Sequence, residues 1–176
     1  MDELLAVVGD NSGDNEFRTY FIRKEGKPIP LQYPFRSSSF TILLVTEGRA
    51  HVQVNLINYV LHPDEMLVIA PDAVRQFKNL SFDCSVSAVG FSRDFLMHAG
   101  IHQNNVDAIE LLALQNEPFV KIAPPTTSNI DGLLHVLDAK RRESPASIYS
   151  EEIIRHSFAA VIYKQQKLSK TTKRLK

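Results

Sequence analysis

Few residues in this chain have the type and spacing that metal binding or catalysis would need. His98 and His102 are four residues apart, a spacing that on a helix would place both imidazoles on one face as a zinc-like pair. Gly100 lies between them and no third ligand is near in the sequence. We therefore interpret both histidines, like the isolated His51 and His62, as structural or surface residues. The sequence also has no Gly-x-Ser-x-Gly nucleophile motif, no phosphate-binding loop and no dinucleotide-binding glycine pattern.

Composition and charge are typical of a globular protein from a reducing compartment. Cys84 is the only cysteine, which excludes an internal disulfide and favours the cytoplasm. Residues 1–8 lack the features of a signal peptide, and no stretch approaches the roughly 20 apolar residues that a membrane span needs. Residues 140–176 carry ten Lys/Arg against three Asp/Glu. The rest of the chain is therefore acidic and has no electrostatic reason to bind nucleic acid, whereas the basic end is either a solvated helix end or a nucleic-acid contact.

The residue pattern up to Phe91 predicts a β-rich body. Short runs of β-branched, aromatic and apolar residues alternate there with Gly, Pro, Asn and Asp, and strands at such close, regular spacing favour a barrel or a sandwich. Thr41 begins an uninterrupted apolar run to Val45, which predicts a strand covered on both faces. The predicted strands are residues 17–23, 40–46, 50–55, 59–61, 66–69, 76–80 and 83–91.

After Ser92 the apolar residues fall at helical spacing. Ser92 is a predicted N-cap of a short helix, residues 106–115 form a second helix, and 119–122 an extended link. Two longer amphipathic helices, 127–142 and one from Ser150, are expected to form a helical hairpin. One face of the last helix is apolar. This face either covers the barrel or pairs with a second copy of the chain, and we predict the two-fold dimer. The predicted dimerisation residues are Ile153, Ile154, Phe158, Val161 and Ile162.

Two segments resemble the cupins. Val45-Thr46-Glu47-Gly48 is an apolar strand ending in a Gly turn, and residues 61–71 read as a corner followed by an apolar strand that runs into Pro71. Asp64 stands where cupins usually have Gly, and Asp takes left-handed backbone angles at modest cost. The resemblance implies a mainly β chain with C-terminal helices, built as a cupin-like (double-stranded β-helix or jelly-roll) barrel plus a helical hairpin.

The places that correspond to cupin metal ligands are occupied by other residue types. Cupin enzymes hold a metal with a His-x-His pair and a Glu before the Gly turn, and with one His after the later Pro. Those places fall near Pro34-Phe35-Arg36, near Thr41 and near Arg75-Gln76, which cannot form a His/carboxylate cage. We therefore expect no metal, no cofactor and no enzymatic activity. The alternatives are a small cupin enzyme that uses unexpected ligands and a free-standing cupin small-molecule-binding protein.

The succession of these parts resembles the N-terminal half of the AraC-type bacterial transcription regulators. The resemblance rests on residues 46–48, 61–65, 68–71, 91–95 and 149–154. It implies an arm (1–16), a barrel (17–91), short helices and a link packed on the barrel (92–126), a dimerisation hairpin (127–170) and the start of a linker (171–176). The helix-turn-helix units that read DNA in this family would follow Lys176, so we expect a truncated chain or, as the alternative, a free-standing sensor domain.

The resemblance also implies that a small effector binds inside the barrel. Arg36 or Arg75 would form paired hydrogen bonds to a carboxylate or a sugar hydroxyl, Phe77 would offer an apolar or stacking wall, and the small Val86 and Ala88 would leave room. A surface role for Arg36 and a plain core role for the apolar residues remain open. Beyond the effector, we expect a homodimer, DNA contacts only through the absent domain, and no membrane partner. The predicted ligand residues are Arg36, Thr41, Arg75, Gln76, Phe77, Val86 and Ala88.

Overall fold

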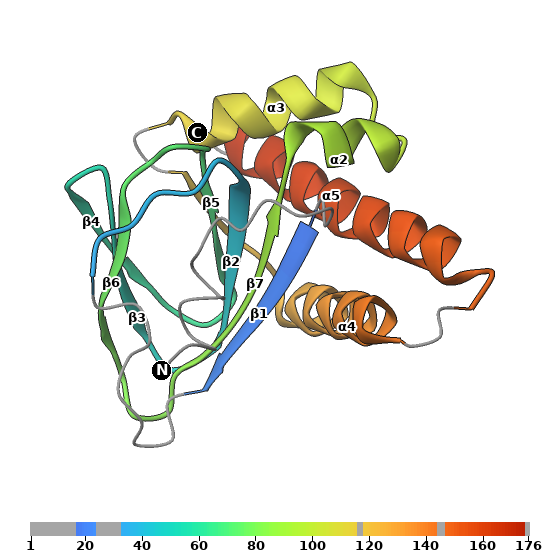
Figure 1. Cartoon of the computed structure of the whole chain (residues 1–176). Helices are drawn as coiled ribbons and strands as arrows, with labels where there is room; N and C mark the ends of the chain where they lie inside the picture. The colour runs from blue at the N-terminus through green and yellow to red at the C-terminus, as the bar shows by residue number, and fades with distance from the viewer. Residues whose placement is uncertain (1–16, 24–32, 116–117, 144–146, 175–176) are drawn as a thin grey trace.

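The computed structural model describes residues 17–23, 33–115, 118–143 and 147–174, with the side chains of the last helix described as far as Lys164. Its body is made of two antiparallel sheets that face each other (Figure 1). The strands are β1 (Phe17–Arg23), β2 (Phe40–Glu47), β3 (Ala50–Val54), β4 (Ile57–Leu61), β5 (Glu65–Ile69), β6 (Arg75–Leu80), β7 (Ser85–Phe91) and β8 (Phe119–Lys121). One sheet has the order β1-β7-β2-β5-β8 and the other has the order β4-β3-β6.

The larger sheet is covered on both faces, as the apolar run in β2 predicts. Leu43 and Val45 point into the space between the two sheets, where they pack in an inner cluster that also contains Phe77 of the smaller sheet. Ile42 and Leu44 alternate with them and pack in a second cluster on the outer face of the sheet. Side chains on a strand point alternately to opposite faces, so a strand buried on both faces has no polar face.

The helices lie on the outer face of the larger sheet (Figure 1). They are α2 (Arg93–His98), α3 (Gln103–Ala113), α4 (Pro124–Arg142) and α5 (Ser150–Arg174). Aromatic side chains join α5 to the sheet and to α2. The Phe158 ring stands edge-on to Phe91 of β7, with ring centroids 5.0 Å apart, and to Phe95 of α2, at 4.7 Å. In the described part of the chain, no helix combines the length and the apolar character that crossing a membrane would need.

The turns follow the chemistry of their residues. Gly48 has φ +67°, and a Cβ there would lie 2.7 Å from the backbone of Cys84, so the β2–β3 turn requires glycine. Asp64 has φ +66°, as expected for the residue that replaces the usual cupin glycine. Its carboxylate accepts a hydrogen bond of 2.6 Å from the Thr127 hydroxyl of α4. The Ser92 hydroxyl caps α2 by accepting from the Phe95 amide at 3.0 Å, which confirms the predicted N-cap.

Several boundaries differ from the sequence-based expectation. The second helix, α3, covers residues 103–113 instead of 106–115, and most strands begin or end one or two residues from the predicted positions. The predicted link at residues 119–122 contains β8, which pairs with β5 and extends the larger sheet. Pro124 and Pro125 form the first turn of α4 instead of preceding it, because a helix loses no hydrogen bond when proline occupies its first turn. The last helix runs to Arg174, beyond the predicted end at residue 170. The predicted N-terminal arm and the break at residues 144–146 lie outside the described residues.

Candidate functional site

The inner face of the larger sheet gathers polar side chains near one level of the barrel. Arg18 of β1, Gly90 of β7 and Thr41 of β2 are neighbours across three strands. Two residues further along these strands, Tyr20 and Ala88 are also cross-strand neighbours, and Ala88 belongs to the inner cluster. Because side chains two positions apart share a face, Arg18, Tyr20, Gly90 and Thr41 all lie on the side that faces the barrel interior.

Arg75 completes this group from the opposite sheet, where it begins β6. Its residue is only 4% exposed, and its Nη1 donates to the Thr41 hydroxyl at 2.5 Å. Nη2 lies 3.2–3.4 Å from the carbonyl oxygens of Ser37, Ser39 and Ala70. All these acceptors are uncharged, and among the described residues Arg75 forms no ion pair. Within that part of the chain the guanidinium is therefore a buried positive charge that is hydrogen-bonded but not ion-paired.

Burial perturbs the two ionisable groups at this site in opposite directions. Loss of hydration lowers the pKa of the Arg75 guanidinium below its ordinary value, to about 10, although Tyr20 and Asp72 attract the charge and oppose the shift. Burial raises the pKa of the Tyr20 hydroxyl, while the charges of Arg18, Arg141 and Arg75 act against that rise. At neutral pH Arg75 is thus charged and Tyr20 is neutral. A site with a cation and neutral hydroxyl donors suits an anionic oxygen.

The structure brings five of the predicted ligand residues to the barrel interior. Thr41 and Arg75 are in direct contact, and the predicted apolar wall residues Phe77, Val86 and Ala88 are all buried in the inner cluster. This placement is compatible with a ligand wall and with a plain core.

Arg36 and Gln76 are placed away from this group. Arg36 is exposed. Gln76 lies between Arg75 and Phe77 on β6, so its side chain points to the outer face of the smaller sheet. Neither residue joins Thr41 and Arg75.

Sequence reasoning missed Arg18, Tyr20 and Gly90. A signal for the first two was available, because Arg18, Tyr20 and Ile22 alternate along one face of a predicted strand. That face could be assigned to the interior only with the pairing between β1 and β7 known.

The positions that correspond to cupin metal ligands do converge, but around a guanidinium. Phe35 and Arg75 pair through their backbones, with N–O distances of 3.0 and 2.9 Å, and the Arg75 guanidinium lies 5.8 Å from the centroid of the Phe35 ring. Thr41, at the place of the cupin Glu, accepts from the same guanidinium. Among the described residues no group of three or more His, Cys, Asp or Glu side chains could hold a metal. The Arg75 charge would also repel a cation placed there.

A polar seam joins α4 to the outer side of the strands that carry the site. The Thr19 hydroxyl of β1 donates to Asp138 at 2.7 Å, and the Ser87 hydroxyl of β7 donates to Asp131. His135 stacks on Phe21 of β1, with ring centroids 4.1 Å apart. Since outward residues alternate with inward ones, each strand contacts α4 at positions adjacent to the interior group. The seam therefore links the barrel interior to the helical hairpin through Thr19 and Phe21 of β1 and Ser87 of β7.

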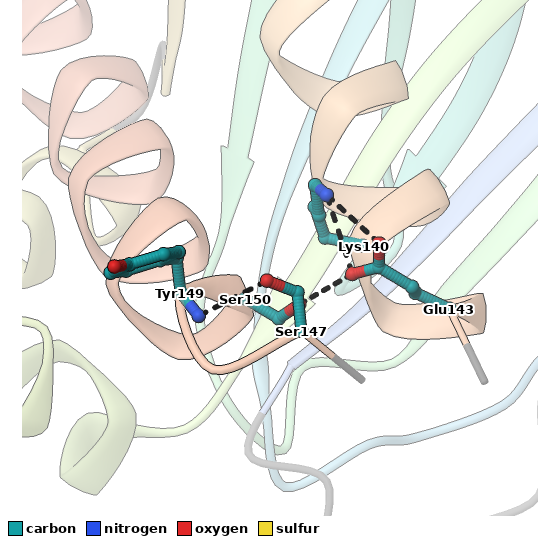
Figure 2. A network of polar contacts seen from close by, with 5 residues as sticks. All are labelled: Lys140, Glu143, Ser147, Tyr149 and Ser150. Atoms are coloured by element: carbon teal, nitrogen blue, oxygen red, sulfur yellow. Dashed lines mark hydrogen bonds and ion pairs between the residues drawn. The ribbon is translucent and has the colours of Figure 1, made fainter. Parts of the chain in front are cut away.

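The two helices of the hairpin are joined by a second polar network (Figure 2). Glu143, at the end of α4, accepts from Lys140 Nζ at 3.1 Å and from the Ser150 hydroxyl at the start of α5. The Ser147 hydroxyl accepts from the Tyr149 amide at 3.2 Å. The hydrogen bond from Ser150, followed by that from Lys140, lowers the pKa of the Glu143 carboxyl. The contacts tie the end of one helix to the beginning of the other.

The predicted dimerisation residues divide into two groups. Phe158, Val161 and Ile162 are completely buried in the outer cluster of the protomer itself, so a second copy cannot reach them in this arrangement. Ile153 and Ile154 are half-buried, and Ile154 also packs against the outer cluster. The apolar pattern of the helix is thus largely explained by packing within the chain.

Comparisons with known proteins identify the fold. No protein-family model matches the sequence, and no curated protein is significantly similar to it. The chain is similar in structure to apo ToxT from Vibrio cholerae, with 10% identity, 88% of this chain and 57% of ToxT covered, and a TM-score of 0.53. ToxT bound to (E)-4-(8-methylnaphthalen-1-yl)but-3-enoic acid is 16% identical (89% and 58% covered, TM-score 0.49). The cupin domain of Schizosaccharomyces pombe Cnp3 is 10% identical (52% and 68% covered, TM-score 0.39).

The likeness to ToxT confirms the predicted fold class. The chain is thus mainly β with C-terminal helices, a cupin-like arrangement that it shares with the matched part of ToxT. It spans 57% of the length of ToxT.

Proposed function

We propose that this domain binds a small anionic molecule inside its barrel and acts, without catalysis of its own, as the sensing and dimerising part of an AraC-type transcription regulator. The observation that carries the proposal is Arg75, a guanidinium that is 4% exposed and that, among the described residues, donates to uncharged acceptors only.

An anionic ligand would offset the unfavourable free energy of burying that charge. Burial lowers the pKa of Arg75 to about 10, because the charged form loses hydration that its neutral acceptors only partly replace. A carboxylate that replaced some of the carbonyl contacts would convert neutral hydrogen bonds into charge-assisted ones, which are roughly twice as strong. The apolar walls formed by Phe77, Val86 and Ala88 suit the hydrocarbon part of such a molecule.

The regulatory part of the proposal is supported by the likeness of the fold to the N-terminal domain of ToxT. Under this proposal, DNA binding belongs to a separate domain. Ligand binding shifts the populations of different hairpin arrangements, and the seam between α4 and the strands transmits the shift. Dimerisation would use the surface side of α5, where the half-buried Ile153 and the 43% exposed Tyr163 lie. Analytical ultracentrifugation that finds only monomer at tens of micromolar would count against this part.

The alternative function is that of a metal-dependent cupin enzyme. The residues at the converging positions, Phe35, Thr41 and Arg75, do not favour it, because none of them is a common metal ligand. Near-stoichiometric transition metal in protein purified without chelator would make the enzyme the preferred proposal.

Thermal unfolding with matched acids and amides tests the ligand class. Hexanoate and benzoate are compared with hexanamide and benzamide, which have nearly the same shape and no charge. At ten times the Kd an acid contributes about 1.4 kcal/mol, which for a chain of this size raises the Tm by about 3 to 6 °C. The amides are expected to have no effect. Equal shifts by acids and amides would contradict an anionic ligand, and no shift by either acid would contradict the proposal.

A further inference from the structure

Gly90 occupies a position where glycine is unusual. It lies in β7, which is hydrogen-bonded to β1 on one side and to β2 on the other, and it is buried. Inside a strand between two partners, glycine adds no packing and loses more conformational freedom on folding than any other residue. Glycine at such a place often marks a bulge or a close approach of a ligand or another part of the backbone.

The backbone does not require glycine there. Gly48 and Gly100 have positive φ values, but Gly90 does not, so any residue could adopt its conformation. The pairing through Gly90 is also regular, because Arg18, Gly90 and Thr41 are in register with their neighbours along the strands. A bulge therefore does not explain the glycine.

Packing does not require glycine either. A Cβ at Gly90 would lie 3.7 Å from the Phe40 carbonyl oxygen, 3.7 Å from Tyr20 Cε2 and 3.9 Å from Thr41 Oγ1. These are ordinary van der Waals distances, so a methyl group fits without displacing a neighbour. For comparison, a Cβ at Gly48 would lie 2.7 Å from the Cys84 backbone, where glycine is obligatory.

The position without a side chain is next to the buried charge. Gly90 faces the interior on the same side of β7 as Val86 and Ala88. Its unused Cβ direction meets the Tyr20 ring and the Thr41 hydroxyl, and that hydroxyl accepts from Arg75. The missing side chain thus leaves a space of about methyl size beside the Tyr20 ring and the Thr41 hydroxyl, and that hydroxyl is hydrogen-bonded to the guanidinium.

We propose that Gly90 is the specificity-determining position of the ligand site, where the absent side chain admits the anionic head group of the ligand between Tyr20 and Thr41. The inference rests on the proposed function, since it assigns a place and a size limit to the same ligand. The head group is a compact one such as a carboxylate. A bulkier anion would need the room that Tyr20 and Thr41 occupy.

The test separates stability from binding with two variants and a control. Gly90→Ala places one methyl group in the space, and Gly90→Val places a larger side chain there. Gly132→Ala is the control, because Gly132 lies in α4 with no atom within 4 Å of its built Cβ. The full chain is unfolded thermally without ligand, and benzoate and hexanoate are then titrated into each folded variant by calorimetry.

Gly90→Ala is expected to unfold at or above the wild-type Tm, because the methyl group fits and the unfolded chain loses freedom. It is expected to weaken benzoate and hexanoate binding about tenfold or more, a typical effect of one methyl group in a fitted site. Gly90→Val is expected to bind still more weakly, and Gly132→Ala to bind as the wild type does.

Two results would overturn this inference and leave the proposed function standing. One is a Tm of Gly90→Ala clearly below that of the wild type, which would mean that packing requires the glycine. The other is Gly90→Ala binding the acids as tightly as the wild type does, because the head group would then lie elsewhere while the site itself exists. Failure of the wild type to bind either acid would instead contradict the proposed function and, with it, this assignment.

Discussion

Replacing Thr19 by Val should loosen α4 from the strand that carries Tyr20. The Thr19 hydroxyl, in a residue that is 6% exposed, donates to Asp138 at 2.7 Å. Val keeps the shape of Thr and removes only the donor. Hydrogen bonds to charged groups contribute about 1.5–3 kcal/mol, so Thr19→Val is expected to lower the free energy of unfolding by that amount at neutral pH.

The matched comparison is Arg142→Ala on the solvent side of the same carboxylate. Arg142 Nε lies 2.9 Å from Asp138, but the arginine side chain is 68% exposed. Exposed ion pairs contribute about 0.2–1 kcal/mol, so this variant should cost less than Thr19→Val. Urea unfolding of both variants measures the two contributions, and the cycle of Thr19→Val, Asp138→Asn and their double mutant gives the coupling energy between Thr19 and Asp138.

The Thr19 contribution should also depend on pH in a defined direction. Burial alone would raise the pKa of the Asp138 carboxyl, but hydrogen bonds from Thr19 and Arg142 outweigh it and lower the pKa. A carboxyl whose pKa is lowered by folding stabilises the protein above its unfolded pKa of about 4, and this stabilisation is lost as the pH falls through the folded value. The cost of Thr19→Val should therefore shrink between pH 7 and about pH 3. An equal cost at both pH values, or an equal cost for Arg142→Ala, would refute the reasoning.

Three further predictions concern the core, a turn and the metal. Phe158→Ala should cost about 3–5 kcal/mol, because its ring is fully buried. Phe82→Ala, at an aromatic residue that is 77% exposed, should stay within about 0.5 kcal/mol. A small loss for Phe158→Ala in urea unfolding would mean that α5 is not packed on the sheet as described. Leu56→Gly should raise the free energy of unfolding by up to about 1 kcal/mol. Leu56 has φ +69° and is 84% exposed, so relief of the backbone strain exceeds the entropy cost of glycine. A lower urea midpoint would contradict this. Plasma mass spectrometry of protein purified without chelator should find transition metal far below stoichiometric amounts, and a near-stoichiometric content would contradict the proposed site.

Strand and turn positions could be predicted because local chemistry determines them. Residues 17–23 alternate along one strand and form β1 with the predicted bounds. The left-handed conformation of Asp64 and the cap by Ser92 follow from properties of the single residues. β8 could not be predicted, because three residues between prolines become a strand only by pairing with β5, more than fifty positions earlier in the sequence.

The site could be predicted only in part, because some of its contacts join residues that are distant in the sequence. The contact between Thr41 and Arg75 follows from the positions that resemble cupin ligand places. The role of Gly90 depends on three-dimensional distances to Tyr20 and Thr41, which no pattern along the chain reveals. The apolar face of α5 was also visible in the sequence, but periodicity does not say whether Phe158 contacts the same chain or a second copy.

The most direct test of the account measures what the Arg75 charge contributes to anion binding. Benzoate is titrated into the wild type, Arg75→Gln and Lys78→Gln, the last removing an exposed positive charge from the same strand. Loss of a charge-assisted hydrogen bond of about 1.5–3 kcal/mol predicts a Kd about 10- to 100-fold higher for Arg75→Gln. Lys78→Gln should leave the Kd unchanged. If Arg75→Gln folds with the wild-type Tm and binds benzoate as tightly as the wild type, the buried guanidinium is a structural element and the central claim is wrong.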